Sequence, residues 1–168
     1  MAITSLVSVE EYLHSTFEHD AEYVGGRIVP RPMPQKPHSK MQSYLVRTLY
    51  EAAHPLGYEV WTEQRVRTQQ NPARYRVSDL CLTHGEPAED VFTKPPYLCV
   101  EILSPDDTAV DLRAEVHEYL AFGVAYVWIN VWIMDPSNGT GEIHTPAGIE
   151  RVQNGRFHAG EVAIQVGR

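Results

Sequence analysis

Two short apolar segments each carry one carboxylate at a position where the pattern predicts another aliphatic side chain. Residues 77–82 contain Asp79, and residues 97–103 contain Glu101. Both segments have the composition of strands buried in a sheet. Because burial removes the solvation of an ionised carboxylate, each group needs a cation or hydrogen-bond donors beside it. Two such groups on neighbouring strands favour a shared divalent cation.

Side chains alternate between the two faces of a strand, so each carboxylate has a defined face. Glu101 shares its face with Cys99 and Leu103. It can therefore lie beside Asp79 if the two strands are neighbours in the sheet. A helical pattern follows over residues 106–122, and its apolar stripe is expected to pack back on that sheet.

The remaining segments predict further elements of an α/β domain. Ser8 and Glu11 form a capping box that begins a short helix over residues 9–17. Gly25-Gly26 lies between strand-like residues and is typical of a tight hairpin turn.

Prolines at positions 30, 32, 34 and 37 predict irregular backbone as far as His38. A helix of about four turns is predicted after it, over residues 39–54. Strands are predicted at residues 58–68, 76–82 and 124–134, the last of them central in the sheet. Asn138-Gly139 and Asn154-Gly155 are typical of hairpin turns.

The chain of 168 residues has the length of one domain. The predicted fold class is α/β, with a mixed twisted β-sheet flanked by helices. Residues 1–37 form an N-terminal helix and β-hairpin, residues 38–136 the core, and residues 137–168 a β-hairpin tail.

The net charge of −8, with only three lysines, weighs against a protein that grips a polyanion along its length. Nucleic acid, if it is the substrate, must be held locally. Four arginines flank Asn71-Pro72 and form either a phosphate-facing edge or a solvated hairpin; they are Arg65, Arg67, Arg74 and Arg76.

The composition also bears on location. The longest apolar run is shorter than the roughly 20 residues that a membrane helix needs, and the first residues lack the pattern of a secretory signal. Cys81 and Cys99 lie in apolar runs and are expected to be buried thiols rather than a disulfide. A cytoplasmic protein without membrane contact is predicted.

The order of these segments resembles the metal-binding core of the PD-(D/E)XK nuclease superfamily: a strand with Asp79, a turn-rich spacer, a strand with Glu101 and then a helix. More narrowly, the chain resembles the Uma-type restriction endonuclease family. Short motifs over most of the chain carry this resemblance: Val9-Glu10-Glu11-Tyr12-Leu13, Glu22 through Val29 ending in Gly26-Arg27-Ile28-Val29, His38, Ser78-Asp79-Leu80, Val100-Glu101-Ile102-Leu103-Ser104-Pro105, Asp111-Leu112, Tyr119, Gly123-Val124 and Asp135-Pro136.

The resemblance implies a restriction endonuclease-like core in which Asp79, Glu101 and the backbone carbonyl of Ile102 bind Mg²⁺ or Mn²⁺. Glu22 would complete the acidic cluster, directly or through water. The implied activity is metal-assisted hydrolysis of phosphodiester bonds in DNA.

Two basic side chains are candidates for contact with this substrate. His38 opens the long helix, and Arg76 lies shortly before the strand carboxylate Asp79. A homodimer is expected, because one site in each chain cuts one strand of a duplex.

The lysine that accompanies such a site is missing. In the family it lies either two residues after the strand glutamate or on the following helix, and these positions are Leu103 and Glu115. A carboxylate there opposes the stabilisation of negative charge. Arg113, on the same helix, is the candidate replacement, although a guanidinium is no equivalent of an ammonium group. Two functions stay open: an active endonuclease, or a catalytically inactive relative that serves as a nucleic-acid-binding or protein-assembly module.

Overall fold

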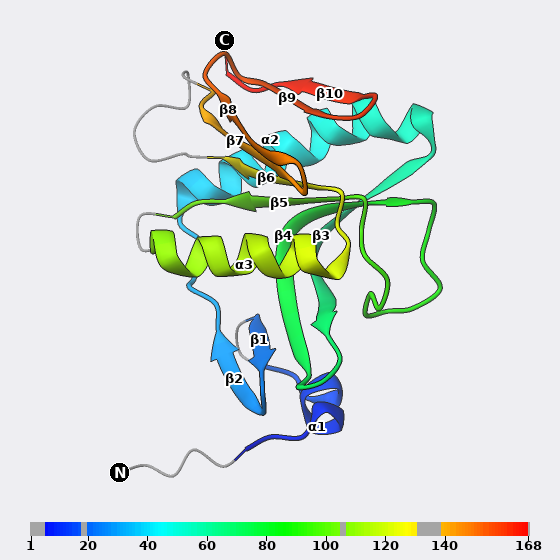
Figure 1. The fold of residues 1–168 in the computed structure, drawn as a ribbon, viewed down its shortest axis with the longest axis vertical. Helices are drawn as coiled ribbons and strands as arrows, with labels where there is room; N and C mark the ends of the chain where they lie inside the picture. The colour runs from blue at the N-terminus through cyan, green and yellow to red at the C-terminus, as the bar shows by residue number, and fades with distance from the viewer. Residues whose placement is uncertain (1–5, 18–19, 105–106, 131–138, 168) are drawn as a thin grey trace.

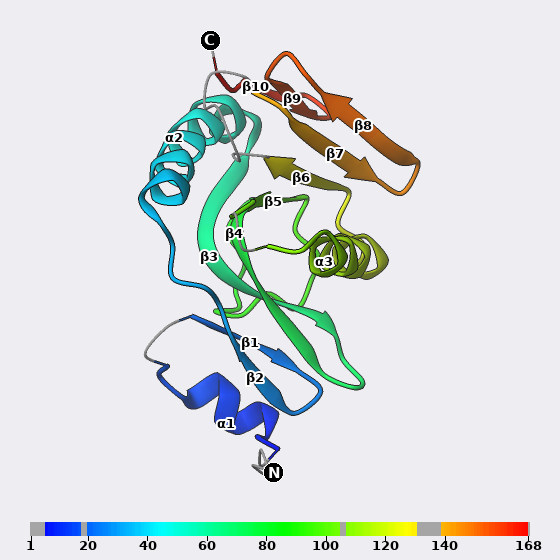
Figure 2. The same cartoon turned by 90° about the vertical axis from the view of Figure 1, so that its left-hand side faces the viewer.

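The computed structural model describes residues 6–17, 20–104, 107–130 and 139–167. One large twisted sheet runs through the molecule, and the two long helices lie on its opposite faces (Figures 1 and 2). The helices are α1 (Val9–His14), α2 (Lys36–Ala53), the short 3-10 helix η1 (His54–Leu56) and α3 (Ala109–Phe122). The strands are β1 (Ala21–Val24), β2 (Arg27–Pro30), β3 (Tyr58–Gln69), β4 (Arg74–His84), β5 (Leu98–Ile102), β6 (Tyr126–Asn130), β7 (Gly141–Thr145), β8 (Gly148–Val152), β9 (Arg156–Ala159) and β10 (Val162–Gln165).

The main sheet has the strand order β2-β1-β4-β5-β6-β7-β8, and β3 also pairs with β4. All the pairs are antiparallel except β5 and β6, which are parallel and joined through α3. A parallel pair needs such a crossover, because its strands run in the same direction. The mixed α/β architecture predicted from the sequence is therefore confirmed.

Strand β4 forks the sheet. One edge of β4 pairs with β3 along most of its length, from Arg74 to His84. The other edge pairs with β1 at Arg74 and Tyr75 and with β5 only from Leu80 to Leu82. Between these two contacts β1 and β5 diverge, so the middle of β4, which includes Asp79, faces an opening. This fork positions the candidate site.

Two apolar cores cover the two faces of the sheet. On one face α2 packs with Leu80, Val100 and Trp128, and β9 and β10 complete this core with Phe157 and Ile164. On the other face α3 packs through Val116 and Tyr119 against Cys81, Cys99 and Val127. The alternation along β4 and β5 therefore places Asp79 and Glu101 on the α3 face.

The N-terminal helix and hairpin attach through aromatic rings. Tyr12, Tyr23 and Tyr75 form a cluster with ring centroids 5.2 to 6.1 Å apart. The Tyr12 hydroxyl donates to the carbonyl of Ala21 at 2.8 Å. Ser8 caps α1 by accepting from the amide of Glu11 at 3.1 Å, as the capping box predicts.

Several boundaries differ from the predictions. Helix α2 begins at Lys36, because Pro37 falls in the first turn, where its missing N–H is not needed. Asn154-Gly155 does not turn a hairpin but links β8, in the main sheet, to β9, in a separate two-stranded sheet. The strand predicted over 124–134 is β6 as far as Asn130; residues 131–138, with the predicted turn residue Asn138, lie outside the described part.

Cys81 and Cys99 are buried free thiols that face each other across β4 and β5. Within the described ranges, no helix is long and apolar enough to cross a membrane.

Candidate metal-dependent active site

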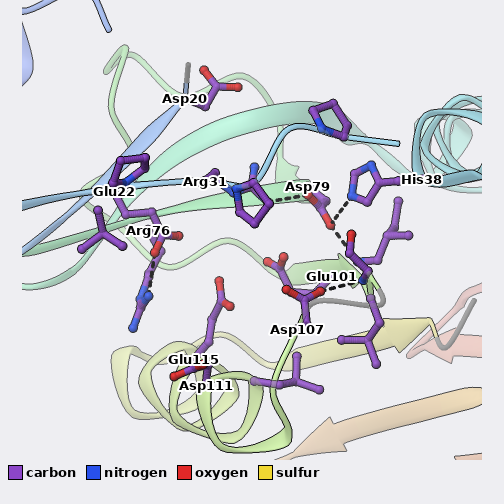
Figure 3. A pocket seen from close by; sticks show the side chains of 18 of the residues that line it. Asp20, Glu22, Arg31, His38, Arg76, Asp79, Glu101, Asp107, Asp111 and Glu115 are labelled. Carbon is purple, nitrogen blue, oxygen red and sulfur yellow. Dashed lines mark hydrogen bonds and ion pairs between the residues drawn. The ribbon is translucent and has the colours of Figure 1, made fainter. Parts of the chain in front are cut away.

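The fork opens into a pocket of about 810 Å³ between the N-terminal hairpin, the start of α2 and the start of α3 (Figure 3). It brings together all the predicted site residues except Arg113: Glu22, His38, Arg76, Asp79, Glu101 and Ile102. Eight carboxylates and two arginines are among the described residues that line it. The pocket is therefore strongly acidic.

Asp79 is almost completely buried and fully paired. Its Oδ1 accepts from Arg31 at 2.6 Å, and its Oδ2 accepts from the Ile102 amide at 2.7 Å and lies 3.2 Å from Nε2 of His38. Burial alone would raise the pKa of Asp79, but the hydrogen bond from His38 and the charge of Arg31 outweigh it and hold that pKa below its ordinary value. The pairing of β5 with β4 ends at Val100, so the Ile102 amide has no backbone acceptor on β4 and donates to the Asp79 carboxylate instead.

Glu101 lies in the same pocket with the opposite surroundings. It is 6% exposed, and its Oε1 is buried without a hydrogen-bond partner among the described residues. Burial, and then the charges of Glu115 and Asp79, raise the pKa of Glu101 well above its ordinary value. One pocket thus holds Asp79, whose charge is compensated by Arg31, and Glu101, which has no basic partner among the described residues.

Glu115 faces the pocket from α3. Burial and the charge of Glu22 raise its pKa to about 8, although Arg76 and Arg31 act in the opposite direction. Its Oε1 accepts a long hydrogen bond of 3.4 Å from the Tyr119 hydroxyl. The position where the resemblance implies a lysine therefore holds a carboxyl group that favours its neutral form.

Glu22 and Arg76 form a separate ion-pair network. Glu22 accepts from the amide of Val77 at 3.1 Å, at the unpaired edge of β4, and from Arg76 at 2.6 Å. Arg76 also donates to Glu118 of α3 at 2.7 and 2.8 Å. These bonds tie β1, β4 and α3 together. Arg76, the predicted substrate contact, thus lines the pocket with three of its N–H groups engaged by carboxylates.

Arg113 does not line the pocket. It is exposed on α3, whereas Leu112, Ala114 and Glu115 line the cavity. At 100° per residue, Arg113 lies about 200° around the helix from Glu115. A side chain on that face is not placed to substitute for the lysine that the resemblance implies.

Three residues beside Asp79 were missed by the sequence analysis. Arg31 joins Asp79 to Glu63 of β3, and Gln42 of α2 donates to Glu63 Oε1 at 2.6 Å and to the Asp79 carbonyl at 3.1 Å. Glu63 has φ of +49°, a conformation that a residue with a side chain adopts at a cost. The sequence gives no signal for Glu63, because the same strand also contains Glu59, Arg65 and Arg67.

The pocket fits a hard divalent cation. No three histidine, cysteine or carboxylate side chains within the described ranges form a ready-made metal cluster. Mg²⁺ does not require one, because it keeps several waters and uses one or two carboxylates. Asp79 and Glu101 supply such oxygen ligands, and the unpartnered Oε1 of Glu101 is a buried acceptor that a cation would satisfy.

These surroundings predict how metal-free stability depends on pH. Glu101 and Glu115 bind protons more tightly in the folded than in the unfolded protein. Their contribution to the free energy of unfolding is therefore complete below the unfolded pKa near 4.5. It is lost as the pH rises through the folded pKa, which is about 8 for Glu115. We expect the free energy of unfolding in EDTA to fall between pH 5 and pH 8. Urea titrations of the wild type and of Glu115→Gln test this.

The Glu115→Gln variant should lose less stability over that pH range, while Glu51→Gln, an exposed substitution on α2, should behave as the wild type does. A free energy of unfolding that stays constant or rises from pH 5 to pH 8 would contradict the assignment.

Comparison with known proteins identifies the family and the fold. The model of the Uma2 family, described as "Putative restriction endonuclease", matches residues 9–166. A solved structure from Anabaena variabilis, described as "a putative nuclease belonging to DUF820", is similar with a TM-score of 0.76 and 24% identity over 95% of this chain and 94% of that one. No curated protein matches the sequence. The structural likeness shows a common fold.

Proposed function

Because the chain belongs to the Uma2 family of restriction endonuclease-like proteins, we propose that it is a metal-dependent endonuclease that hydrolyses phosphodiester bonds in DNA with Mg²⁺ or Mn²⁺. The observation that carries the proposal is the buried carboxylate oxygen of Glu101, which has no partner in the described part of the chain and lies in one pocket with Asp79. A cation supplies the partner that this oxygen lacks.

The excess of negative charge supports a cation over a structural role for the two acids. A buried carboxylate that only stabilised the fold would be expected to have a donor or a basic partner, as Asp79 has in Arg31. Glu101 instead lies beside Glu115, another acid. An acidic pocket also needs bound cations before it can accept a phosphate, which fits a protein with a net charge of −8.

Asp79, Glu101 and the carbonyl of Ile102 would hold the ion. When bound, it polarises the phosphate, lowers the pKa of a coordinated water and stabilises the charge that develops. The Ile102 amide and His38 orient the Asp79 carboxylate. Glu22, engaged with Val77 and Arg76, lines the wall of the pocket and would contribute to holding an ion directly or through water.

His38, the other predicted substrate contact, lines the pocket beside Asp79. Its Nε2 faces Asp79, and its buried Nδ1 has no hydrogen-bond partner within the described ranges. The hydrogen bond to Asp79 raises the pKa of His38 although burial opposes it, so the charged imidazolium persists closer to neutral pH. A charged His38 would add positive charge beside a phosphate held in the pocket.

Cleavage of supercoiled plasmid DNA tests the proposal. We expect nicking by the wild type in Mg²⁺ or Mn²⁺ and none in EDTA. Linear product should follow if the active form is a homodimer, which sedimentation measures directly. Absence of cleavage with every divalent cation tried, over a range of DNA substrates, would contradict the enzymatic function.

A catalytically inactive relative that binds nucleic acid or protein is the second candidate. The observation that favours it is Glu115, a carboxyl group in the pocket where the resemblance implies a cation. Under this alternative the wild type binds Mn²⁺ and DNA without cutting, and Glu115→Lys restores cleavage.

Replacement of Glu115 by lysine is expected to increase the rate of plasmid nicking under either alternative, by at least about tenfold, because an ammonium group in an active site contributes through acid–base and charge effects. Glu115→Gln is the matched control, since it removes the carboxylate without adding a cation. A Glu115→Lys rate at or below that of Glu115→Gln would show that a cation on α3 adds nothing.

A further inference from the structure

We propose that Arg31 is the side chain of this pocket that contacts the phosphate to be cleaved, supplying from the N-terminal hairpin the positive charge that α3 lacks. This inference rests on the proposed function and names a residue that the sequence did not indicate.

The backbone fixes Arg31 at the mouth of the fork. It directly follows β2, its amide donates to the carbonyl of Asp20 at 2.9 Å, and prolines precede and follow it. Pro30 and Pro32 restrict the backbone on both sides, so little conformational freedom remains to be lost. From this anchor the side chain reaches across to Asp79 (Figure 3). The guanidinium is therefore held in position before a substrate arrives.

The Arg31 guanidinium has N–H groups that are not used in its two ion pairs. It carries five N–H groups in a fixed plane, and its hydrogen bonds to Glu63 and Asp79 engage two of them. The other three have no partner among the described residues. The side chain is 21% exposed, so it remains open to the pocket. Planar, paired N–H donors match phosphate oxygens, which makes arginine the favoured residue for bidentate recognition of phosphate.

Other basic groups of the pocket are less suited to this role. Arg76 is held by Glu22 and Glu118 through three hydrogen bonds. His38 directs one ring nitrogen at Asp79. On α3, Glu115 faces the cavity and Arg113 lies outside it. Arg76 keeps two of its five N–H groups without a described partner, whereas Arg31 keeps three and is the more exposed of the two, at 21% against 16%.

The surroundings of Arg31 are built to keep it charged and in place. Burial alone would lower its pKa, but the carboxylates of Asp79, Glu101 and Glu63 raise that pKa above its ordinary value. Glu63 adopts its unfavourable backbone conformation while bound to Arg31 and Gln42. Strain retained around one arginine points to a positioned functional group rather than to a solvated surface charge.

The test compares Arg31→Gln and Arg31→Lys with Arg27→Gln, an exposed arginine of the same hairpin that does not line the pocket. Three quantities are measured: plasmid nicking in Mg²⁺, Mn²⁺ affinity by calorimetry without DNA, and binding of a fluorescent DNA duplex in Ca²⁺ by anisotropy. We expect Arg31→Gln to reduce kcat at least about a hundredfold, the size of effect seen when one charge-stabilising donor is removed. Its Mn²⁺ affinity should stay equal to that of the wild type or become tighter, because a competing cation leaves Asp79.

Arg31→Lys keeps a positive charge opposite Asp79, so it should fold and should retain part of the activity. If Arg31→Gln does not fold, the same three quantities measured on Arg31→Lys test the inference. Loss of Mn²⁺ binding together with cleavage would overturn the inference, since Arg31 would then only support Asp79. Cleavage equal to or faster than that of the wild type would also overturn it. If the wild type itself does not cut, the proposed function fails alone. At least about tenfold weaker DNA binding by Arg31→Gln than by Arg27→Gln would then still support the phosphate contact, and equal binding would reject it.

Discussion

Glu101→Gln is expected to abolish cleavage and, at the same time, to make the metal-free protein more stable at pH 8. Loss of a metal ligand should remove several kcal/mol of transition-state stabilisation, which is about a thousandfold in rate. The stability gain arises because the substitution removes a buried charge whose Oε1 has no described partner. An unsatisfied buried acceptor costs about 1–3 kcal/mol, and an ionised one costs more.

Chemical denaturation in EDTA measures the gain, with Glu51→Gln on the exposed face of α2 as the control. The difference between Glu101→Gln and the wild type should shrink towards pH 5, where the native carboxyl group takes up its proton. A Glu101→Gln variant that is less stable than the wild type at pH 8 would mean that this carboxylate has a favourable partner after all.

The second large effect has the opposite sign. Asp79→Asn is expected to destabilise the protein by about 3 kcal/mol, because it removes one partner of a buried ion pair and leaves the charge of Arg31 incompletely compensated. An asparagine oxygen can still accept from the Ile102 amide, so the loss reports the charge rather than the backbone contact. Cleavage should be lost as well.

A double-mutant cycle with Arg31→Gln separates these contributions. Because Asp79 and Arg31 are in direct contact at 2.6 Å, their stability effects should be less than additive, with a coupling of about 0.5–3 kcal/mol. Additive effects, or an Asp79→Asn variant as stable as Glu101→Gln, would contradict the difference in environment between the two acids.

The sequence predicted that Asp79 and Glu101 lie on one face of the sheet because one physical rule sufficed. A single carboxylate inside an apolar strand segment is anomalous at Asp79 and at Glu101, and the alternation of side chains places both on one face once β4 and β5 pair. The capping box at Ser8 and the Gly25-Gly26 turn are equally local, and both were predicted with their correct residues.

The partners of these acids depend on topology instead. Arg31 lies 48 positions before Asp79, in a proline-rich segment without periodicity, and reaches it only because β1 pairs with the start of β4. Glu63 is brought opposite Asp79 by the β3–β4 register. No pattern within either segment encodes those meetings, so the ion pair that neutralises Asp79 could not be foreseen.

Arg76 shows the same limit. Its position in an arginine-rich segment is compatible with a phosphate contact, and only the packing of α3 against β4 reveals that Glu118 and Glu22 hold it. The position of helix α3 was predicted from the sequence, but the contact of Glu118 with Arg76 was not. That contact depends on how α3 is rotated about its axis relative to β4.

Calorimetric titration of Mn²⁺ into the wild type and into Glu101→Gln at pH 8 tests most directly whether the unpartnered carboxylate is a metal ligand. We predict binding by the wild type, with fewer protons released as the starting pH rises, and at least about tenfold weaker binding by Glu101→Gln, since each lost ligand contact costs more than 1.4 kcal/mol. Equal Mn²⁺ affinity in the two proteins, or no binding by the wild type, would contradict a metal site at Glu101.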